Sequence, residues 1–262
     1  MNPAGDSPAP GLMIRASRLT VWYQLRDEKP ALRNLSLTVE TGKRVALAGA
    51  NGAGKSTLLL ALTGILLPQE GSLEAAGIPV RRENLRELRR RVGLVFQNPD
   101  DQLFMPTVEE DIAFGPRNLG LDEGEITART EALTERLGIG RLKNRISHHL
   151  SGGEKRLAAL AGILVMEPSL LLLDEPAAFL DPRSRRSLTD MLAGLPETML
   201  IATHDLDMAL DLCHEVIFLR DGAVAARSPV PGLLADGDFL QSVGLELPLS
   251  LRGRQRAAAA PR

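Results

Sequence analysis

The chain has 262 residues, which allows one large domain or one core that carries a smaller subdomain, and its hydrophobic content of 44% is enough for a real core. The formal net charge is −2 with acidic and basic residues interspersed, so charge gives no reason to expect nucleic acid or anionic lipid as a partner. The single cysteine, Cys213, excludes an internal disulfide and fits a reducing cytosol, and the longest apolar runs are far too short to span a bilayer. We therefore expect any contact with a membrane to come through partners only.

The two ends of the chain lack a patterned apolar face. Residues 1–11 are rich in proline and alanine and contain no basic, apolar signal segment, and the last residues run from arginines into alanines. We expect a disordered N-terminus over 1–11, a folded domain over 12–235 and a C-terminal extension over 236–262 whose last residues are disordered.

A glycine-rich loop follows three β-type runs, which lie near Ile14 to Tyr23, Leu35 to Glu40 and Val45 to Ala48. The loop fits the pattern G-x-x-x-x-G-K-[ST] with the residues Gly49, Ala50, Asn51, Gly52, Ala53, Gly54, Lys55 and Ser56, and Thr57 continues it into an apolar helix. In this pattern the backbone N–H groups surround phosphates, the lysine reaches the β- and γ-phosphates, and the serine hydroxyl ligates Mg²⁺. A helix N-terminus also favours anions. The alternative is a glycine-rich turn that only joins a strand to a helix.

A polar, helix-rich stretch then interrupts the strand pattern from about Gln97 to Ala161. Gln97 ends the apolar run Val92 to Phe96, and its amide can reach Mg²⁺ or an attacking water. Leu121 to Leu137 has the pattern of an amphipathic helix. We predict an inserted helical subdomain over about 97–161.

A second candidate phosphate site lies inside this stretch, at Leu150-Ser151-Gly152-Gly153-Glu154. Ser151 is a predicted N-cap, the two glycines let the backbone approach an anion, and an amphipathic helix follows over Glu154 to Met166. The adjacent His148 and His149 make no good shared metal site on a strand or on a helix, so we expect them to pack or to be solvated.

Strand-and-helix alternation resumes with apolar runs at Leu170 to Leu173, Met199 to Thr203 and Val216 to Leu219. This alternation predicts a parallel α/β sheet with functional loops at the carboxyl ends of its strands. There, Asp174 is suited to hold Mg²⁺, Glu175 to act as general base on water, and His204 to contact the γ-phosphate and orient that water. The alternatives are a solvated turn for the two carboxylates and a structural role for the histidine.

The segment Leu150 to Glu154 resembles the signature sequence of the ATP-binding cassette (ABC) ATPases, which many other P-loop enzymes lack. The resemblance implies an α/β P-loop NTPase fold, the ABC nucleotide-binding domain, with an antiparallel β subdomain and an inserted α-helical subdomain. It also implies that ATP lies between two chains arranged head to tail, in a homodimer or a heterodimer with a paralogue. Asp181 then communicates between the sites, and Tyr23, or its neighbour Trp22, stacks on adenine.

The stretch Phe96 to Phe104, continued through Pro106 to Pro116, resembles the energy-coupling-factor (ECF) ATPases. In that family the surface around the glutamine accepts coupling helices of a membrane protein. The resemblance covers about Ile14 to Arg252 and implies a peripheral subunit on the cytoplasmic face of the inner membrane. Its partners are then the ECF transmembrane coupling subunit and substrate-binding membrane subunits. Gly244 to Leu249 looks more like the cobalt and nickel transporters than the vitamin transporters.

We therefore predict the ATP-hydrolysing subunit of an ECF-type importer, with cobalt as the first choice of cargo and nickel as the second, with ATP and Mg²⁺ as cofactors and no nucleic-acid partner. One alternative is an ECF importer of a vitamin such as biotin. Another is a soluble ABC ATPase. Paired cassettes or a long coiled coil would indicate translation or DNA repair, and neither occurs in the sequence, whereas an iron–sulfur assembly ATPase stays open on the general motifs. The last is a P-loop kinase of another family, against which the segment Leu150 to Glu154 argues.

Overall fold

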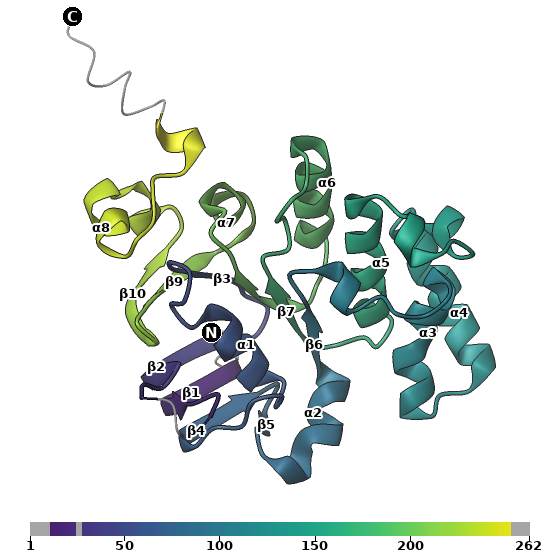
Figure 1. Cartoon of the computed structure of the whole chain (residues 1–262), viewed down its shortest axis with the longest axis horizontal. Helices are drawn as coiled ribbons and strands as arrows, with labels where there is room; N and C mark the ends of the chain where they lie inside the picture. Colours follow the sequence, from purple (N-terminus) through teal and green to yellow (C-terminus); the bar gives the residue numbers. More distant parts are fainter. Residues whose placement is uncertain (1–10, 25–27, 253–262) are drawn as a thin grey trace, which may run out of the picture.

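The computed structural model describes residues 11–24 and 28–252. Residues 1–10, 25–27 and 253–262 lie outside the described part, and the disorder predicted for the two ends falls mostly on them. The described residues form two β-sheets and a set of helices. Helices α3 (Val108–Leu119) and α4 (Glu123–Arg136) lie at one end of the molecule, and β10 (Ala223–Pro229) and α8 (Gly237–Ser242) lie at the other (Figure 1).

A six-stranded sheet positions the predicted site residues. Its strands, in the order β10-β9-β3-β8-β7-β6 across the sheet, are β3 (Arg44–Ala48), β6 (Val92–Val95), β7 (Leu170–Asp174), β8 (Thr198–Ala202), β9 (Glu215–Arg220) and β10 (Ala223–Pro229). All neighbouring pairs are parallel except β10 with β9. The predicted parallel α/β sheet is therefore confirmed, with one antiparallel strand added at its edge.

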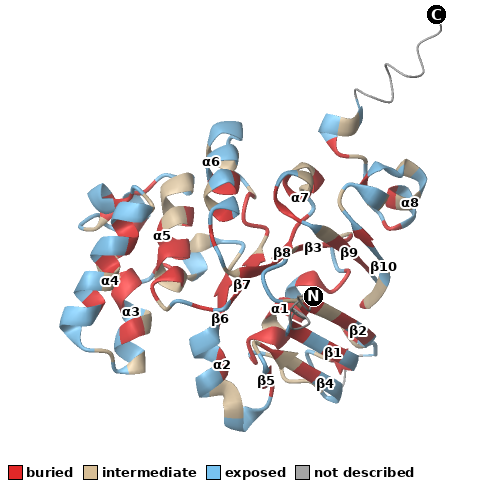
Figure 2. Cartoon of the chain, turned by 180° about the vertical axis from the view of Figure 1, so that it is seen from behind, coloured by how far each residue is buried: buried red, intermediate tan, exposed pale blue. Residues whose placement is uncertain are grey.

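Both faces of this sheet are buried, which explains why its strands read as continuous apolar runs. In β7, Leu171 and Leu173 pack into the apolar cluster on the side of α5, α6 (Pro182–Ala193) and α7 (Leu206–Leu212). Leu170 and Leu172 pack into the cluster on the other side, with α1 (Lys55–Leu62). Figure 2 shows the buried residues concentrated on the strands and on the inner faces of the helices.

The second sheet is antiparallel, in the order β2-β1-β4-β5, and confirms the β subdomain that the family resemblance implied. Its strands are β1 (Leu12–Val21), β2 (Leu32–Glu40), β4 (Glu70–Ala75) and β5 (Ile78–Pro79). Strand β1 ends at Val21, so Trp22 and Tyr23 lie beyond it, contrary to the sequence prediction of a strand through Tyr23.

Three longer helices follow the edge strand β6: α3 (Val108–Leu119), α4 (Glu123–Arg136) and α5 (Gly152–Leu164). Helix α4 begins after Asp122, whose carboxylate accepts the Gly124 N–H, rather than at the predicted Leu121. Helix α5 includes both glycines of the signature-like segment and ends at Leu164, so it starts and stops two residues before the predicted span. Ser151 caps it, as predicted.

The sequence analysis did not predict the remaining helices. They are α2 (Leu85–Arg91), α6, α7, α8 (Gly237–Ser242) and short 3₁₀ helices at Arg82–Asn84, Pro99–Asp101, Gly140–Leu142, Ser147–His149 and Gly232–Ala235. Within the described ranges, none of the helices has the length and apolar character needed to cross a membrane.

Candidate functional site

The predicted site residues follow strands that end at one edge of the six-stranded sheet. In the parallel pairings Leu47 lies opposite Ala202, and Asp174 also lies opposite Ala202. Val95 of β6 is paired with Leu173 of β7. Because parallel strands end at the same edge, the loops after β3, β6, β7 and β8 all emerge there. The phosphate loop, Gln97, Glu175 and His204 are carried by those loops.

The phosphate loop needs glycine for reasons that the structure makes visible. Gly54 is the N-cap of α1 in the left-handed conformation, with φ of 102°. A Cβ there would lie 2.8 Å from the Leu32 side chain and 3.0 Å from the Ala31 carbonyl oxygen. At Gly49 a Cβ would lie 2.4 Å from the Leu219 carbonyl oxygen. The backbone can therefore take this path only without side chains at these two positions.

Lys55 is buried inside this loop, with 7% of its surface exposed. Its Nζ donates hydrogen bonds to the carbonyl oxygens of Gly49, at 2.7 Å, and Ala50, at 3.2 Å. Burial lowers the pKa of Lys55, and the nearby carboxylates of Glu175 and Asp174 only partly oppose that shift. The ammonium group is thus held at the loop, close to two acidic groups.

Asp174 and Ser56 form a pair with the donor chemistry of a magnesium site. The Ser56 side chain donates a hydrogen bond to the Asp174 carboxylate. Oδ1 of the same carboxylate is buried and has no hydrogen-bond partner among the described residues. Burial raises the pKa of Asp174, and the hydrogen bond from Ser56 opposes it. A buried carboxylate oxygen without a partner beside a serine hydroxyl fits a hard divalent cation.

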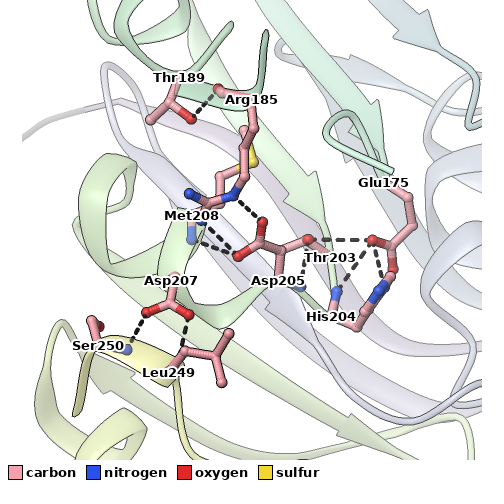
Figure 3. Close-up of polar contacts among 10 residues, drawn as sticks. All are labelled: Glu175, Arg185, Thr189, Thr203, His204, Asp205, Asp207, Met208, Leu249 and Ser250. Carbon is pink, nitrogen blue, oxygen red and sulfur yellow. Dashed lines mark hydrogen bonds and ion pairs between the residues drawn. The ribbon is translucent and has the colours of Figure 1, made fainter. Parts of the chain in front are cut away.

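Glu175 and His204 form a hydrogen-bonded unit between the ends of β7 and β8 (Figure 3). Glu175 Oε2 lies 2.8 Å from His204 Nδ1 and accepts the His204 backbone N–H at 3.2 Å and the Thr203 hydroxyl at 3.3 Å. Only 9% of the Glu175 side chain is exposed, against 64% for His204. The backbone of Glu175 has φ of 44°, a strained value for a non-glycine residue, and strain of this kind concentrates at functional sites.

The residue after His204, Asp205, forms an ion pair with Arg185 that the sequence analysis missed. Arg185 of α6 binds Asp205 with two nitrogens, one of them Nη2 at 2.8 Å from Oδ1, as Figure 3 shows. Asp205 also caps α7 by accepting the Met208 N–H at 2.9 Å. Burial raises the pKa of Asp205, but the hydrogen bonds from Arg185 and Met208 outweigh it, so the net pKa is lowered. Arg185 is twenty residues away in the sequence, and no local pattern connects it to Asp205.

Asp181 lies at the start of the same helix α6. Its carboxylate caps that helix by accepting the backbone N–H groups of Arg183, at 2.9 Å, and Ser184, at 3.1 Å. The Ser184 hydroxyl is the main cause of the lowered pKa of Asp181. The predicted role of Asp181 between two sites is not tested by this contact, but α6 does connect Asp181 to Arg185 and so to the loop of His204.

The signature-like segment is built as a capping box. The Ser151 N–H donates to Glu154 Oε2 at 3.0 Å, and the Ser151 hydroxyl accepts the Glu154 N–H at 3.4 Å. The hydrogen bond from Ser151 lowers the pKa of Glu154, and Arg141, 2.7 Å away, adds to the effect. Ser151, Gly153 and Glu154 line a cavity of about 370 Å³. The phosphate loop instead lines another cavity, of about 1010 Å³, with Glu175 and His204.

Of the two aromatic candidates for adenine, Tyr23 is better placed. Its side chain is exposed, and its hydroxyl lies 3.1 Å from the Thr57 hydroxyl at the start of α1. Trp22 is more buried, and its backbone N–H donates to the side chain of Gln69, just before β4. An open aromatic face beside the phosphate loop is what stacking on a base requires.

A third cavity, of about 290 Å³, lies between β6 and the helices α3 and α5. It is lined mostly by apolar side chains, among them Phe96, Phe104 and Phe114. The rings of Phe104 and Phe114 meet edge to face with centroids 4.8 Å apart, although Phe104 is 60% and Phe114 40% exposed. Large exposed apolar groups around a hollow are typical of a docking surface.

Comparison with known proteins places these features in a family. A family model described as ABC transporter matches residues 32–178, which is more than half of the chain. A putative ABC transporter ATP-binding protein of Gloeobacter violaceus is 53% identical over 87% of this chain and 95% of its own length. The energy-coupling factor transporter ATP-binding protein EcfA of Methanoculleus marisnigri is 45% identical over 85% of this chain and 82% of its length.

Two solved structures share the fold. The first is cbiO1 from Clostridium perfringens, described as part of the ABC transporter complex cbiONQ, with a TM-score of 0.79 and 35% identity over 94% of this chain and 99% of that one. The second is a dimeric ATP-binding cassette in a post-hydrolysis state bound to ADP and Pi, with a TM-score of 0.75 and 26% identity over 84% of this chain and 100% of that one.

Proposed function

The chain belongs to the ABC transporter family as an ATP-hydrolysing subunit of the energy-coupling-factor type, and on that premise we propose that it powers an importer of cobalt or nickel ions. The observation that carries the enzymatic part is the hydrogen-bonded pair of Glu175 and His204 beside the phosphate loop. The choice of metal ions rests on the resemblance of Gly244 to Leu249. The match to cbiO1, which is described as part of the ABC transporter complex cbiONQ and extends over 94% of the chain, supports a place in a transporter complex.

The chemistry proposed for the site follows from what each side chain offers. The backbone N–H groups of Gly49 through Thr57 bind the phosphates, and Lys55 leaves its two carbonyl partners to contact the β- and γ-phosphates. Ser56 and Asp174, with Gln97, hold Mg²⁺, which neutralises phosphate charge when it is bound.

Glu175 is the proposed general base, because its carboxylate is buried, oriented by three donors and adjacent to the loop. General-base help of this kind is worth roughly 10²–10⁴-fold in rate. When His204 carries a proton on both ring nitrogens, Nδ1 donates to that carboxylate and Nε2 can donate to the γ-phosphate. Most of the remaining catalysis is positioning and electrostatic stabilisation.

We further propose that the active form is a dimer, either of two copies or with a paralogue. The phosphate loop and the Ser151 N-terminus of α5 line different cavities in one chain, so a second chain is needed to bring both to one nucleotide. The dimeric cassette bound to ADP and Pi supports this arrangement. In the proposed dimer of this chain, the residues Ser151 through Glu154 of one copy contact the γ-phosphate of the ATP that the other copy holds, next to Asp181.

The apolar cavity of Phe96, Phe104 and Phe114 is the proposed docking surface for the transmembrane coupling subunit. An apolar side chain of a short partner helix can fill it, and the substrate-binding membrane subunits then attach through that partner. Docking in this way places the chain on the cytoplasmic face of the inner membrane.

The division into a domain over 12–235, with a helical subdomain over about 97–161, and an extension over 236–262 remains our proposal. It is supported by the grouping of α3, α4 and α5 at one end of the molecule.

The test is ATP-dependent accumulation of radioactive cobalt and nickel in cells that express the chain with its neighbouring membrane subunits, compared with Lys55→Ala. We expect uptake of one or both ions, lost in the variant. Absence of metal uptake with membrane association intact would replace the cargo with a vitamin such as biotin. Absence of membrane association would favour an assembly ATPase.

A further inference from the structure

Arg156, in the second turn of α5, is a buried cation that the proposed chemistry does not use. Its exposed fraction is 3%, and its pKa is lowered by burial. Nη1 donates to the Phe96 carbonyl oxygen at 2.8 Å, and Nη2 donates to the Gln97 carbonyl oxygen at 2.7 Å. Nε is buried and finds no hydrogen-bond partner in the described part of the chain. Among the ion pairs of the described residues, none includes Arg156.

A charge in this position is unfavourable in two ways. A buried guanidinium without a carboxylate partner keeps much of its desolvation penalty. It also lies near the N-terminus of α5, where the helix dipole repels cations. An apolar side chain of the same length would fill the space without either penalty. The two charge-assisted hydrogen bonds to the backbone after β6 are what the arginine adds.

The same backbone segment is tied to α5 by two more side chains. Gln102 Nε2 donates to the Ala159 carbonyl oxygen at 2.7 Å, and its Oε1 accepts the Phe96 N–H at 3.4 Å. Lys155 Nζ lies 2.6 Å from Asp100 Oδ1. Three side chains therefore hold residues 96–102 against α5, namely Arg156, Gln102 and Lys155. Of these three, Arg156 is the buried one.

We propose that Arg156 is a positioning residue that aims the Gln97 side chain into the nucleotide site and joins its movement to Ser151. The inference rests on the proposed function, because it assigns Gln97 to the magnesium ion and the water. Arg156 lies five residues after Ser151, about 7.5 Å along the helix axis. A rigid helix of that length transmits a shift of the Gln97 backbone to the capping serine, and a shift of the serine to Gln97.

The first measurement is hydrogen–deuterium exchange of residues 96–102 in the nucleotide-free protein. We expect faster exchange in Arg156→Met, which keeps the apolar stem but loses both hydrogen bonds, and an intermediate rate in Arg156→Lys, which keeps the charge and can make one bond. Arg129→Met is the matched control, because Arg129 is an arginine on α4 whose ion-pair partners are Glu125 and Glu167 rather than the backbone of residues 96–102. Its exchange in 96–102 should equal that of the wild type.

The second measurement is a kinetic cycle of Arg156→Met, Gln97→Ala and the double variant. We expect Arg156→Met to lower kcat roughly ten- to a hundredfold with KM for ATP nearly unchanged, as misplacement of a positioned group does. The double variant should be no slower than Gln97→Ala, because Arg156 acts through Gln97.

Three results would overturn the proposal: unchanged exchange in both Arg156 variants, a wild-type kcat for Gln97→Ala, or losses that multiply in the double variant. If Arg156→Met does not fold, exchange and kcat of Arg156→Lys decide the question. Wild type without ATP hydrolysis would refute the proposed function. The exchange experiment, which needs no nucleotide, would still decide whether Arg156 holds residues 96–102.

Discussion

Replacing Glu175 with glutamine changes one oxygen of the site into an NH₂ group and leaves the size of the side chain unaltered. The amide oxygen can still accept the His204 backbone N–H and the Thr203 hydroxyl, so the local fold should survive. What is lost is the negative charge and the basicity of the carboxylate. Loss of general-base catalysis amounts to roughly 10²–10⁴-fold in kcat, which corresponds to about 3 to 5 kcal/mol of barrier.

Binding should respond in the opposite direction from hydrolysis. Glu175 is one of the two carboxylates beside Lys55, so its neutralisation removes a negative group from a site that must accept phosphates. We therefore expect Glu175→Gln to bind ATP at least as tightly as the wild type and to accumulate as an ATP-bound dimer.

The assays are phosphate release under saturating ATP, equilibrium binding of a fluorescent ATP analogue, and sedimentation with and without ATP. Glu167→Gln is the matched control, because Glu167 also has a positive φ, of 52°, but its side chain is 71% exposed and pairs with Arg129. It should hydrolyse ATP like the wild type. Hydrolysis at the wild-type rate by folded Glu175→Gln would remove Glu175 from the role of general base.

Three further predictions concern stability and reactivity. Gly54→Ala should lower the free energy of unfolding by roughly 1–3 kcal/mol, because φ of 102° is strained for alanine and its Cβ would meet the Leu32 side chain; thermal melting checks this, and an unchanged melting temperature contradicts it. Arg185→Lys should lower stability by about 1–2 kcal/mol, because lysine cannot make the two-nitrogen contact with Asp205; urea unfolding measures it, with Arg183→Lys at an exposed position as control. Burial raises the pKa of Cys213 to about 12 from 9.0, so a thiol reagent at pH 8 should label it only when the protein unfolds. The folded state holds the Cys213 proton more tightly than the unfolded state does. The contribution of Cys213 to the free energy of unfolding is therefore fully present below pH 9.0 and falls by roughly 1.4 kcal/mol per pH unit as the pH rises towards 12. The wild type should lose stability over that range, and Cys213→Ala should lose less.

The phosphate loop and the strand ends could be predicted because the patterns that encode them are local. Gly54 and Lys55 are set by a turn followed at once by a helix, and Asp174, Glu175 and His204 each follow a short apolar run. Parallel strands necessarily end at one edge, so placing residues at strand ends was enough to bring them together. The boundary errors at Tyr23, Leu121 and Glu154 were each of two residues, and at the two helix starts capping geometry rather than apolar pattern decides the boundary.

The contacts that hold this site in shape could not be predicted from the sequence. Arg185 meets Asp205 across two helices, and Arg156 meets carbonyl oxygens some sixty residues earlier in the chain. A carbonyl oxygen belongs to every residue, so no side-chain pattern marks it as a partner.

The sequence by itself determined the fold type, the family and the loops that carry the chemistry, because the spacing of apolar residues and the stereochemistry of turns act within a few residues. Tertiary structure alone decided which cavity each loop lines, including the separation of Ser151 from Gly49, Ala50 and Asn51 of the phosphate loop into different cavities. It also decided which buried charges are paired and which, like Arg156, are held by backbone. Those outcomes depend on how whole elements pack against one another, and packing is a property of the folded chain rather than of any short segment.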